Sequence, residues 1–251
     1  MNRAAHLAWD AEGLWQALQP LLPGLSVEVL ARCESTNSEL LQRARTVAGR
    51  RSSDTQPTLL VAELQTRGRG RAERRWHAAL GASLTFSLAL PLAPRQWSGL
   101  SLLVGLALAE ALDPARPAQA PRIGLKWPND LWLWEGPGRG RKLGGILIET
   151  VPVGDQRMAV IGVGLNVRPL ADTDLDPATL SQGYACLAEL DPAATPPGVL
   201  AQVAPPLVQA LRAFADQGLA PRLGAYARRD GLAGQPVQAA AADGGAAVVT
   251  G

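Results

Sequence analysis

The segment 65–71 of this chain, with the sequence QTRGRGR, combines residue types that handle phosphate groups. Its glycines allow backbone N–H groups to approach a ligand closely, and its arginines supply positive charge. It is not a Walker A loop, because the chain contains no GxxxxGK followed by Ser or Thr. It is not a dinucleotide fingerprint either, because Glu73 stands where the third glycine is needed. The segment therefore predicts a loop that binds a polyphosphate.

Two other interpretations of this loop remain open from the residues themselves. The cluster of Arg67, Arg69, Arg71, Arg74 and Arg75 could serve only solubility, in a hairpin that faces water. A basic Arg/Gly loop is also typical of RNA binding, and Trp76 is available to stack on a base.

A second segment, 126–130 with the sequence KWPND, places a lysine and an acid on either side of a tight turn. The Lys126 ammonium is suited to stabilise negative charge that develops on a phosphoryl or acyl oxygen. Asp130 is suited to hold Mg²⁺ or to orient the lysine. Lys126 and Lys142 are the only lysines among the 24 lysines and arginines, and a compact ammonium is not equivalent to a guanidinium in a small site. A surface ion pair across an ordinary turn is the alternative.

The apolar run 160–167, with the sequence VIGVGLNV, holds two glycines and one amide inside a predicted buried strand. Glycine in a strand often marks a place where a ligand approaches the backbone closely. We expect a flat base there, with Asn166 as the polar group that reads it. The alternative is a β-bulge.

These segments must be positioned by a framework that hydrophobic periodicity and turn residues predict. Helices are expected over 11–22, 36–47, 97–112 and 199–217. Strands are expected over 26–30, 58–63, 83–90, 123–127, 131–134, 145–150 and 159–167. Because hairpin signals join several strands and the helices are grouped, the predicted fold is α+β, with a mixed, mostly antiparallel sheet and packed helices.

Smaller features complete this framework. Ser35 or Thr36 is expected to cap the second helix, with Glu39 forming a capping box if Thr36 is the cap. Residues 49–57 and 170–197 read as loops. One large domain is expected over 1–227, followed at 228–251 by an Ala/Gly-rich β segment too short to fold alone.

The composition excludes several classes of protein. The net charge of +2 gives no general attraction to nucleic acid or membranes. The longest apolar stretch, 100–112, is shorter than the roughly 20 residues that span a bilayer, and no signal peptide is evident. Cys33 and Cys186 lie in no zinc or disulfide pattern. We expect a cytoplasmic protein without a membrane partner.

Taken in order, five motifs resemble one family, the biotin protein ligases, also called biotin–acetyl-CoA-carboxylase ligases. The matching segments are 35–37 (STN), 62–71 (AELQTRGRGR) with Trp76, 126–130 (KWPND), 142–149 (KLGGILIE) and 162–167 (GVGLNV). The resemblance covers residues 26–170. About 25 residues precede the first predicted strand, too few for a helix-turn-helix domain, so the chain resembles the form that does not bind DNA.

The resemblance implies a two-step reaction. The biotin carboxylate attacks the α-phosphate of Mg·ATP, and pyrophosphate leaves. A lysine of a biotin carboxyl carrier domain then attacks the bound biotinyl-adenylate. No covalent enzyme intermediate is needed, so the lack of a Ser/His/Asp or Cys/His motif is expected. The chain would act as a monomer or homodimer.

The resemblance also implies roles for individual residues. Lys126, as electrophilic stabiliser, and Arg71 are the implied catalytic residues, and Asp130 is the implied Mg²⁺ ligand. The implied biotin contacts are Ser35, Thr36, Asn37, Gln65, Arg69, Gly70, Arg71, Lys126, Gly144 and Gly145. The implied ATP contacts are Arg69, Arg71, Trp76, Asn129, Lys142 and Asn166, with Trp76 against the adenine.

This sequence departs from the family pattern in two places. Ala72 and Glu73 stand where the loop usually has a basic residue and a glycine. The segment 228–251 corresponds to a truncated form of the family's small SH3-like β-barrel.

A lipoate ligase or an octanoyltransferase with the same fold is the enzymatic alternative. The transferase would need a nucleophilic cysteine, for which Cys33 is the candidate near Ser35. The non-enzymatic alternative is a nucleotide- or RNA-binding module without catalytic activity.

Overall fold

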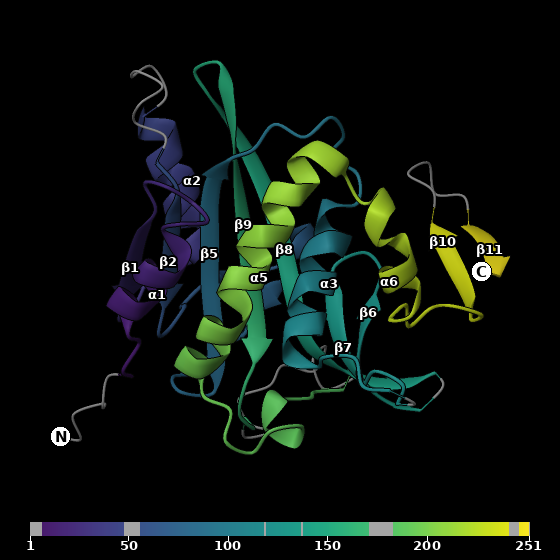
Figure 1. The fold of residues 1–251 in the computed structure, drawn as a ribbon. Helices are drawn as coiled ribbons and strands as arrows, with labels where there is room; N and C mark the ends of the chain where they lie inside the picture. The colour runs from purple at the N-terminus through teal and green to yellow at the C-terminus, as the bar shows by residue number, and fades with distance from the viewer. Residues whose placement is uncertain are drawn as a thin grey trace.

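The central element of the fold is a mixed sheet of seven strands in the order β1-β2-β5-β9-β8-β7-β6 (Figure 1). The computed structural model describes residues 7–47, 56–117, 119–136, 138–170, 183–240 and 246–250. The sheet strands are Ser26–Leu30 (β1), Thr58–Ala62 (β2), Ser83–Pro91 (β5), Ile123–Lys126 (β6), Asp130–Gly136 (β7), Arg139–Val153 (β8) and Gln156–Asn166 (β9). Only the β1–β2 pair among these is parallel, which confirms the predicted mixed, mostly antiparallel sheet.

Two short strand pairs lie outside this sheet. Gly68–Arg69 (β3) pairs with Arg75–Trp76 (β4), so the Gly/Arg loop forms a small antiparallel ribbon around a 3-10 turn at Arg71–Glu73. Pro236–Ala240 (β10) pairs with Ala246–Thr250 (β11), both within the segment 228–251 where β structure is expected. Of the two predicted loops, over 49–57 and 170–197, residues 49–55 and 171–182 lie outside the described residues.

Four helices confirm the predicted ones with adjusted ends: Ala11–Leu18 (α1), Thr36–Val47 (α2), Leu100–Leu112 (α3) and Pro196–Gln217 (α5). A further short helix, Leu223–Ala227 (α6), was not predicted. Helix α3 begins later than predicted because Gly99, with φ 86°, has a left-handed conformation that ends the preceding loop. Helix α5 begins earlier, since Thr195 caps it and proline is tolerated in a first turn, where an N–H has no helical partner.

Helix α2 begins differently from the predicted capping box. The N–H of Ser38 donates to Ser35 Oγ at 3.4 Å, so Ser35 is the capping residue. The N–H of Thr36 donates to the Gln65 side chain, and Glu39 pairs with Arg43. The capping box with Thr36 as cap is therefore wrong, and Thr36 is available to the site described below.

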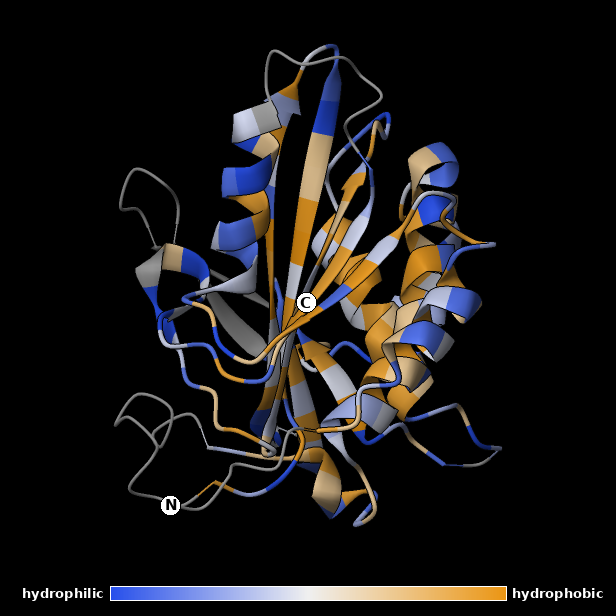
Figure 2. Cartoon of the chain, turned by 90° about the vertical axis from the view of Figure 1, so that its left-hand side faces the viewer, coloured by the Kyte–Doolittle hydropathy of each residue, from blue (hydrophilic) through white to orange (hydrophobic). Residues whose placement is uncertain are grey.

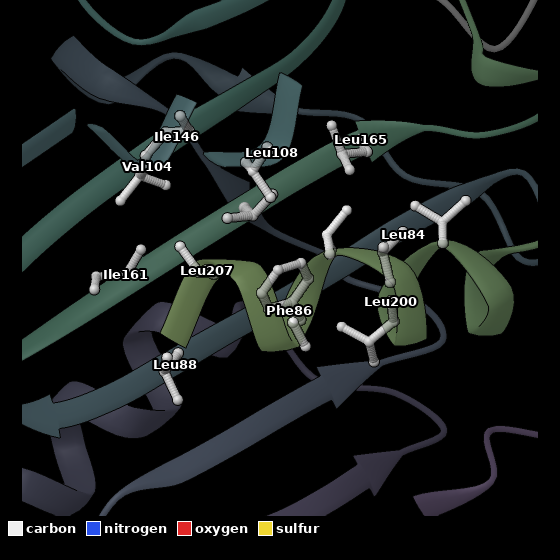
Figure 3. Packing of buried hydrophobic residues seen from close by; sticks show 14 of the residues in the cluster. Leu84, Phe86, Leu88, Val104, Leu108, Ile146, Ile161, Leu165, Leu200 and Leu207 are labelled. Atoms are coloured by element: carbon white, nitrogen blue, oxygen red, sulfur yellow. The ribbon is translucent and has the colours of Figure 1, made fainter. Parts of the chain in front are cut away.

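The main core lies between the sheet and the helices α3 and α5 (Figure 3). Strand β5 alternates polar and apolar residues, and its apolar set, Leu84, Phe86 and Leu88, points into this core. Helix α3 is apolar on nearly every side and almost entirely buried, as expected for a helix packed between a sheet and a second helix. No helix among the described residues is long and apolar enough to cross a membrane.

The opposite face of the sheet carries helix α2 and a smaller apolar cluster. Figure 2, turned by 90° from Figure 1, shows helices on both sides of the sheet. The cluster under α2 consists of Leu40, Leu41, Leu60, Ala89, Val151, Val153, Met158 and Val160. It covers only part of this face, and the polar residues of β5 continue beyond it: Ser83, Thr85 and Ser87 are buried here. The predicted site residues meet on this part of the face, beyond the apolar cluster.

The chain after α6 is anchored to the β6 edge of the sheet. The N–H of Leu125 donates to the carbonyl of Arg229 at 2.7 Å, and the N–H of Gly231 donates to the carbonyl of Leu125 at 2.9 Å. The Arg229 guanidinium is buried and pairs with Asp113, with Nη1 3.1 Å from Oδ2. Residues 229–231 therefore extend the framework that carries Lys126.

Candidate active site

A row of residues crosses the sheet on the face opposite α3 and α5. Strand pairing aligns Thr85 on β5 with Gly164 on β9, Gly164 with Gly145 on β8, and Gly145 with Asp130 on β7. Asp130 in turn opposes Lys126 on β6. Because paired residues share a face, segments separated by up to about 80 residues form one floor with two glycines at its centre.

Trp76 lies on the glycine floor. A Cβ at Gly164 would come within 2.4 Å of the Trp76 ring, and one at Gly145 would lie 3.7 Å from it. Strands β5, β9 and β8 keep unbroken register through Gly164, so the bulge alternative is wrong at this point. The Trp76 indole N–H is buried and has no hydrogen-bond partner among the described residues. The Trp76 ring therefore makes the close approach to the strand backbone that Gly164 predicts. Its indole N–H is a hydrogen-bond donor that remains available at the same place.

The two lysines of the chain have different neighbours at the end of the row. Lys142 Nζ lies 2.9 Å from Asp130 Oδ1. Lys126 Nζ lies 3.9 Å from the ring centre of Trp132, a cation–π contact. The sequence predicts that Asp130 holds Mg²⁺ or orients Lys126, but in the structure its carboxylate pairs with Lys142. Among the described residues, the Lys126 ammonium contacts an aromatic face and forms no ion pair with a carboxylate.

The Gly/Arg loop is joined to this floor by its arginines. Arg69 Nη2 lies 2.8 Å from Glu149 Oε1, and Arg69 Nη1 donates to Ser38 Oγ at 3.1 Å. Arg71 Nη1 lies 3.4 Å from Asn129 Oδ1, which brings the loop to the KWPND turn. These contacts hold the loop against the glycine floor, where its arginines lie beside the predicted site residues.

Two loop residues show how tightly the loop turns. Ala72 has φ 51° and ψ 43°, in the left-handed region that favours glycine. The N–H of Gly70 donates to the carbonyl of Arg74 at 2.7 Å, and a Cβ at Gly70 would lie 3.3 Å from that oxygen. The family pattern has a glycine close to Ala72, so this departure falls on a part of the loop with a strained backbone.

A chain of hydrogen bonds, buried at Ser87 and partly buried on either side of it, connects the predicted biotin residues. Gln65 Oε1 accepts from the Thr36 N–H at 2.7 Å and from its hydroxyl at 3.2 Å. Ser87 Oγ lies 2.6 Å from both Thr36 Oγ1 and Asn37 Oδ1. Asn37 Nδ2 donates to Glu149 Oε2 at 3.0 Å. Because Glu149 also binds Arg69, the chain runs from Gln65 to the loop without a break.

Ser87 and Glu149 carry this network, yet the sequence analysis assigns neither of them to the site. Glu149 ends a matched motif, and Ser87 lies in an alternating strand, where a serine looks like an ordinary polar position. The glycine opposite Ser87 on strand β9 is a signal in the sequence that could have identified this position. A Cβ at Gly162, the partner of Ser87, would lie 2.2 Å from Asn37 Oδ1, so the glycine leaves room for the amide.

Three further predicted residues have mainly backbone neighbours. Asn166 is buried, and its Nδ2 donates to the carbonyls of Ala185 at 3.0 Å and Lys142 at 3.3 Å. It thereby ties β9 to the segment after residue 183. A Cβ at Gly144 would lie 2.6 Å from Leu165, on the core side of the sheet, so Gly145 rather than Gly144 faces the floor. Asn129 donates from Nδ2 to the carbonyl of Ile146 at 2.8 Å, which fixes the turn.

The cysteine required by the transferase alternative is poorly suited to nucleophilic attack. Burial, together with the charges of Glu39 and Glu34, raises the pKa of the Cys33 thiol to about 11. A reactive cysteine has a lowered pKa, because the thiolate is the nucleophile. Burial also raises the pKa of Cys186.

Among the described residues, no group of three or more His, Cys, Asp or Glu side chains could hold a metal ion.

The chain is similar in sequence to proteins that are named ligases. The bifunctional ligase/repressor BirA of Escherichia coli is 36% identical over 220 residues, which cover 86% of this chain and 63% of that protein. The chain thus spans less than two thirds of that relative. The biotin–acetyl-CoA-carboxylase ligase of Paracoccus denitrificans is 31% identical over 214 residues, covering 83% of this chain and 82% of the relative.

Solved structures and a family profile point the same way. The biotin protein ligase from Aquifex aeolicus, in complex with biotin and ATP, superposes with a TM-score of 0.64 at 25% identity, covering 89% of this chain and 85% of that one. The profile of the biotin/lipoate A/B protein ligase family matches residues 30–166, which contain every predicted site residue. The chain belongs to the biotin/lipoate A/B protein ligase family.

Proposed function

We propose that this chain is an ATP-dependent ligase that forms biotinyl-5'-AMP from biotin and ATP and transfers biotin to a lysine of a biotin carboxyl carrier domain. The observation that carries the proposal is the cross-strand row, which gathers Lys126, Asp130 and two glycines beneath the arginine loop. Relatives that are named biotin ligases, and a fold neighbour bound to biotin and ATP, support the choice of substrates.

The first step would take place over the glycine floor. The biotin carboxylate attacks the α-phosphorus of Mg·ATP, the bond to the β-phosphate oxygen breaks, and pyrophosphate leaves. The Lys126 ammonium would stabilise charge on the reacting oxygens, and preorganised charge of this kind is usually the largest catalytic contribution. Arg69 and Arg71 cover the phosphates, and magnesium enters with ATP as part of the substrate.

The acid would lie along the hydrogen-bond chain. A ureido group needs both donors and acceptors in an otherwise apolar slot, because an unpaired buried polar group costs about 1–3 kcal/mol. Gln65, Thr36 and Ser35 supply such groups at one end of the row. In the second step the acceptor amine attacks the acyl carbonyl and AMP leaves, without any covalent bond to the enzyme. We place the reaction in the cytoplasm.

Biotin-dependent exchange of pyrophosphate into ATP tests the proposal. The expected result is exchange with biotin and not with lipoate, lowered by about 10²-fold or more in Lys126→Ala. Arg95→Ala, which removes an exposed cation from the loop before α3, is the matched control and should exchange as the wild type does. Absence of exchange with either acid would contradict a ligase of this kind, and exchange with lipoate alone would reassign the substrate.

A further inference from the structure

Trp127 is the most exposed large apolar side chain among the described residues, with 63% of its surface open to solvent. It follows Lys126 directly and lies in the turn between β6 and β7. An exposed indole leaves a large apolar area in water, and tryptophan is enriched among the residues that dominate protein–protein interfaces. Its position beside Lys126 places that apolar area at the edge of the candidate site.

The turn presents Trp127 on a fixed backbone. Ser101 Oγ donates to the carbonyl of Pro128 at 3.0 Å, which ties the turn to helix α3. The N–H of Ile146 donates to the carbonyl of Asn129 at 3.0 Å, and the Asn129 amide donates back to the Ile146 carbonyl. A side chain held on an ordered backbone loses less conformational entropy when a partner covers it.

Two cationic side chains lie at this turn, whereas its carboxylate is already paired. Lys126 directly precedes Trp127, and Arg71 Nη1 lies 3.4 Å from Asn129 Oδ1, two residues beyond Trp127. Asp130 is paired with Lys142. An incoming lysine ammonium is repelled by such a surface unless carboxylates accompany it. The surface that approaches this site therefore needs acidic residues beside its lysine.

We propose, resting on the proposed function, that Trp127 is a docking residue for the acceptor protein, whose matching surface carries an apolar residue next to its lysine and carboxylates around it. The acceptor nitrogen must come within about 3–3.5 Å of the acyl carbon beside Lys126. A protein surface that brings an amine so close covers the neighbouring residue of the turn as well. Trp127 would then be buried in the complex and contribute to acceptor affinity without taking part in adenylate formation.

The experiment compares a protein acceptor with a small one. When the acceptor amine attacks the acyl carbonyl, the C–N bond forms, the C–O bond to phosphate breaks, AMP leaves with the electron pair, and the amine loses a proton. Hydroxylamine follows the same course and gives a hydroxamate, but it has no surface to dock. In Trp127→Ala we expect the KM for a biotin carboxyl carrier domain to rise about tenfold or more. Pyrophosphate exchange and hydroxamate formation should match the wild type.

Two variants serve as controls. Trp15→Ala removes another exposed tryptophan, 44% exposed on helix α1, and should leave the KM for the carrier unchanged. Trp127→Phe keeps an aromatic face and should restore most of the affinity. In the wild type, added salt should raise the KM for the carrier more than it affects hydroxylamine capture, since screening weakens charge complementarity.

Each other outcome overturns a defined part of the proposal. An equal loss of exchange, hydroxamate formation and protein transfer in Trp127→Ala would place the indole within the adenylation site. An unchanged KM for the carrier would remove it from docking. A change in sedimentation without a change in KM would assign the surface to a second copy of the chain. If the wild type shows no exchange, the proposed function fails first and the docking role fails with it.

Discussion

Asp130 and Lys142 form an ion pair between β7 and β8, with Oδ1 and Nζ 2.9 Å apart. This pair leaves Lys126, the cross-strand neighbour of Asp130, without an ion-pair partner among the described residues. Lys142 therefore acts within the framework, whereas the charge of Lys126 remains available to a ligand. The two lysines can be distinguished by replacing each with arginine.

Lys126→Arg should lower the rate of pyrophosphate exchange by about 10²-fold, while Lys142→Arg should lower it by less than about tenfold. In Lys142→Arg the guanidinium can keep the ion pair with Asp130, because its shape matches a carboxylate well. In Lys126→Arg the guanidinium is larger than an ammonium and its charge is delocalised, so it cannot replace the compact charge of the lysine. Steady-state exchange measurements at saturating biotin and ATP give both values. Equal losses in the two variants would contradict this division of roles.

Ser87→Ala should weaken biotin binding by about 5- to 100-fold, although Ser87 lies beneath residues expected to bind biotin. The change removes two bonds of 2.6 Å and leaves Thr36 and Asn37 partly unpaired in a buried setting, at a cost of about 1–3 kcal/mol. Isothermal titration with biotin measures the effect. Ser26→Ala is the control, because it removes a hydroxyl that bonds Thr58 and has no bond to Thr36 or Asn37 among the described residues. A similar loss in both variants would indicate general destabilisation.

Cys33 should remain a protonated, slowly reacting thiol at neutral pH, because its pKa is raised to about 11. Folding therefore binds the thiol proton more tightly; this contribution to stability is complete below the unfolded pKa and is lost as pH rises through about 11. In a Cys186→Ala background, iodoacetamide labelling should accelerate about tenfold per pH unit toward that value. Rapid labelling at pH 7, or loss of biotin transfer in Cys33→Ser, would revive the transferase alternative.

Arg229→Ala should lower the free energy of unfolding by about 3–5 kcal/mol, because it leaves the Asp113 carboxylate without its buried partner. Arg222→Ala is the matched control. Its pair with Glu110 is exposed, with 45% of the arginine side chain in contact with solvent, and such pairs contribute about 0–1 kcal/mol. Urea unfolding of both variants gives the comparison. A loss below about 1 kcal/mol in Arg229→Ala would show that the C-terminal anchor adds little.

The elements of the fold could be predicted because their local patterns agree with their surroundings. Strand β5 alternates apolar and polar residues, and both sets are used: Phe86 in the core, Ser87 on the other face. The parallel pairing of β1 with β2 could not be predicted, since it depends on the path of a segment that includes α2. Strand β8 is longer than the strand predicted over 145–150, because Gly138 and Gly140 resemble turn residues in isolation.

The site was predictable as a set of segments but not as a set of contacts. Glycines 145 and 164 indicate a close approach, yet only strand register shows that they face each other and Trp76. The contact between Asn37 and Glu149 joins residues 112 positions apart, and no local pattern encodes such a pairing. The Asp130–Lys142 pair was missed for a related reason: the turn suggested Lys126, whereas a register shift beside Trp132 brings in the other lysine.

The anchoring of residues 229–231 has a mechanical consequence for the reaction centre. Leu125, whose N–H and C=O both bond to this segment, is joined to Lys126 by a single peptide unit. The Trp134 ring fills the space beside Gly124 and Gly231, where added Cβ atoms would lie 2.0 and 1.9 Å from it, so the two backbones cannot slide past each other freely. A displacement of residues 229–231 would therefore shift the backbone at Leu125, and with it the lysine on which the proposed chemistry depends.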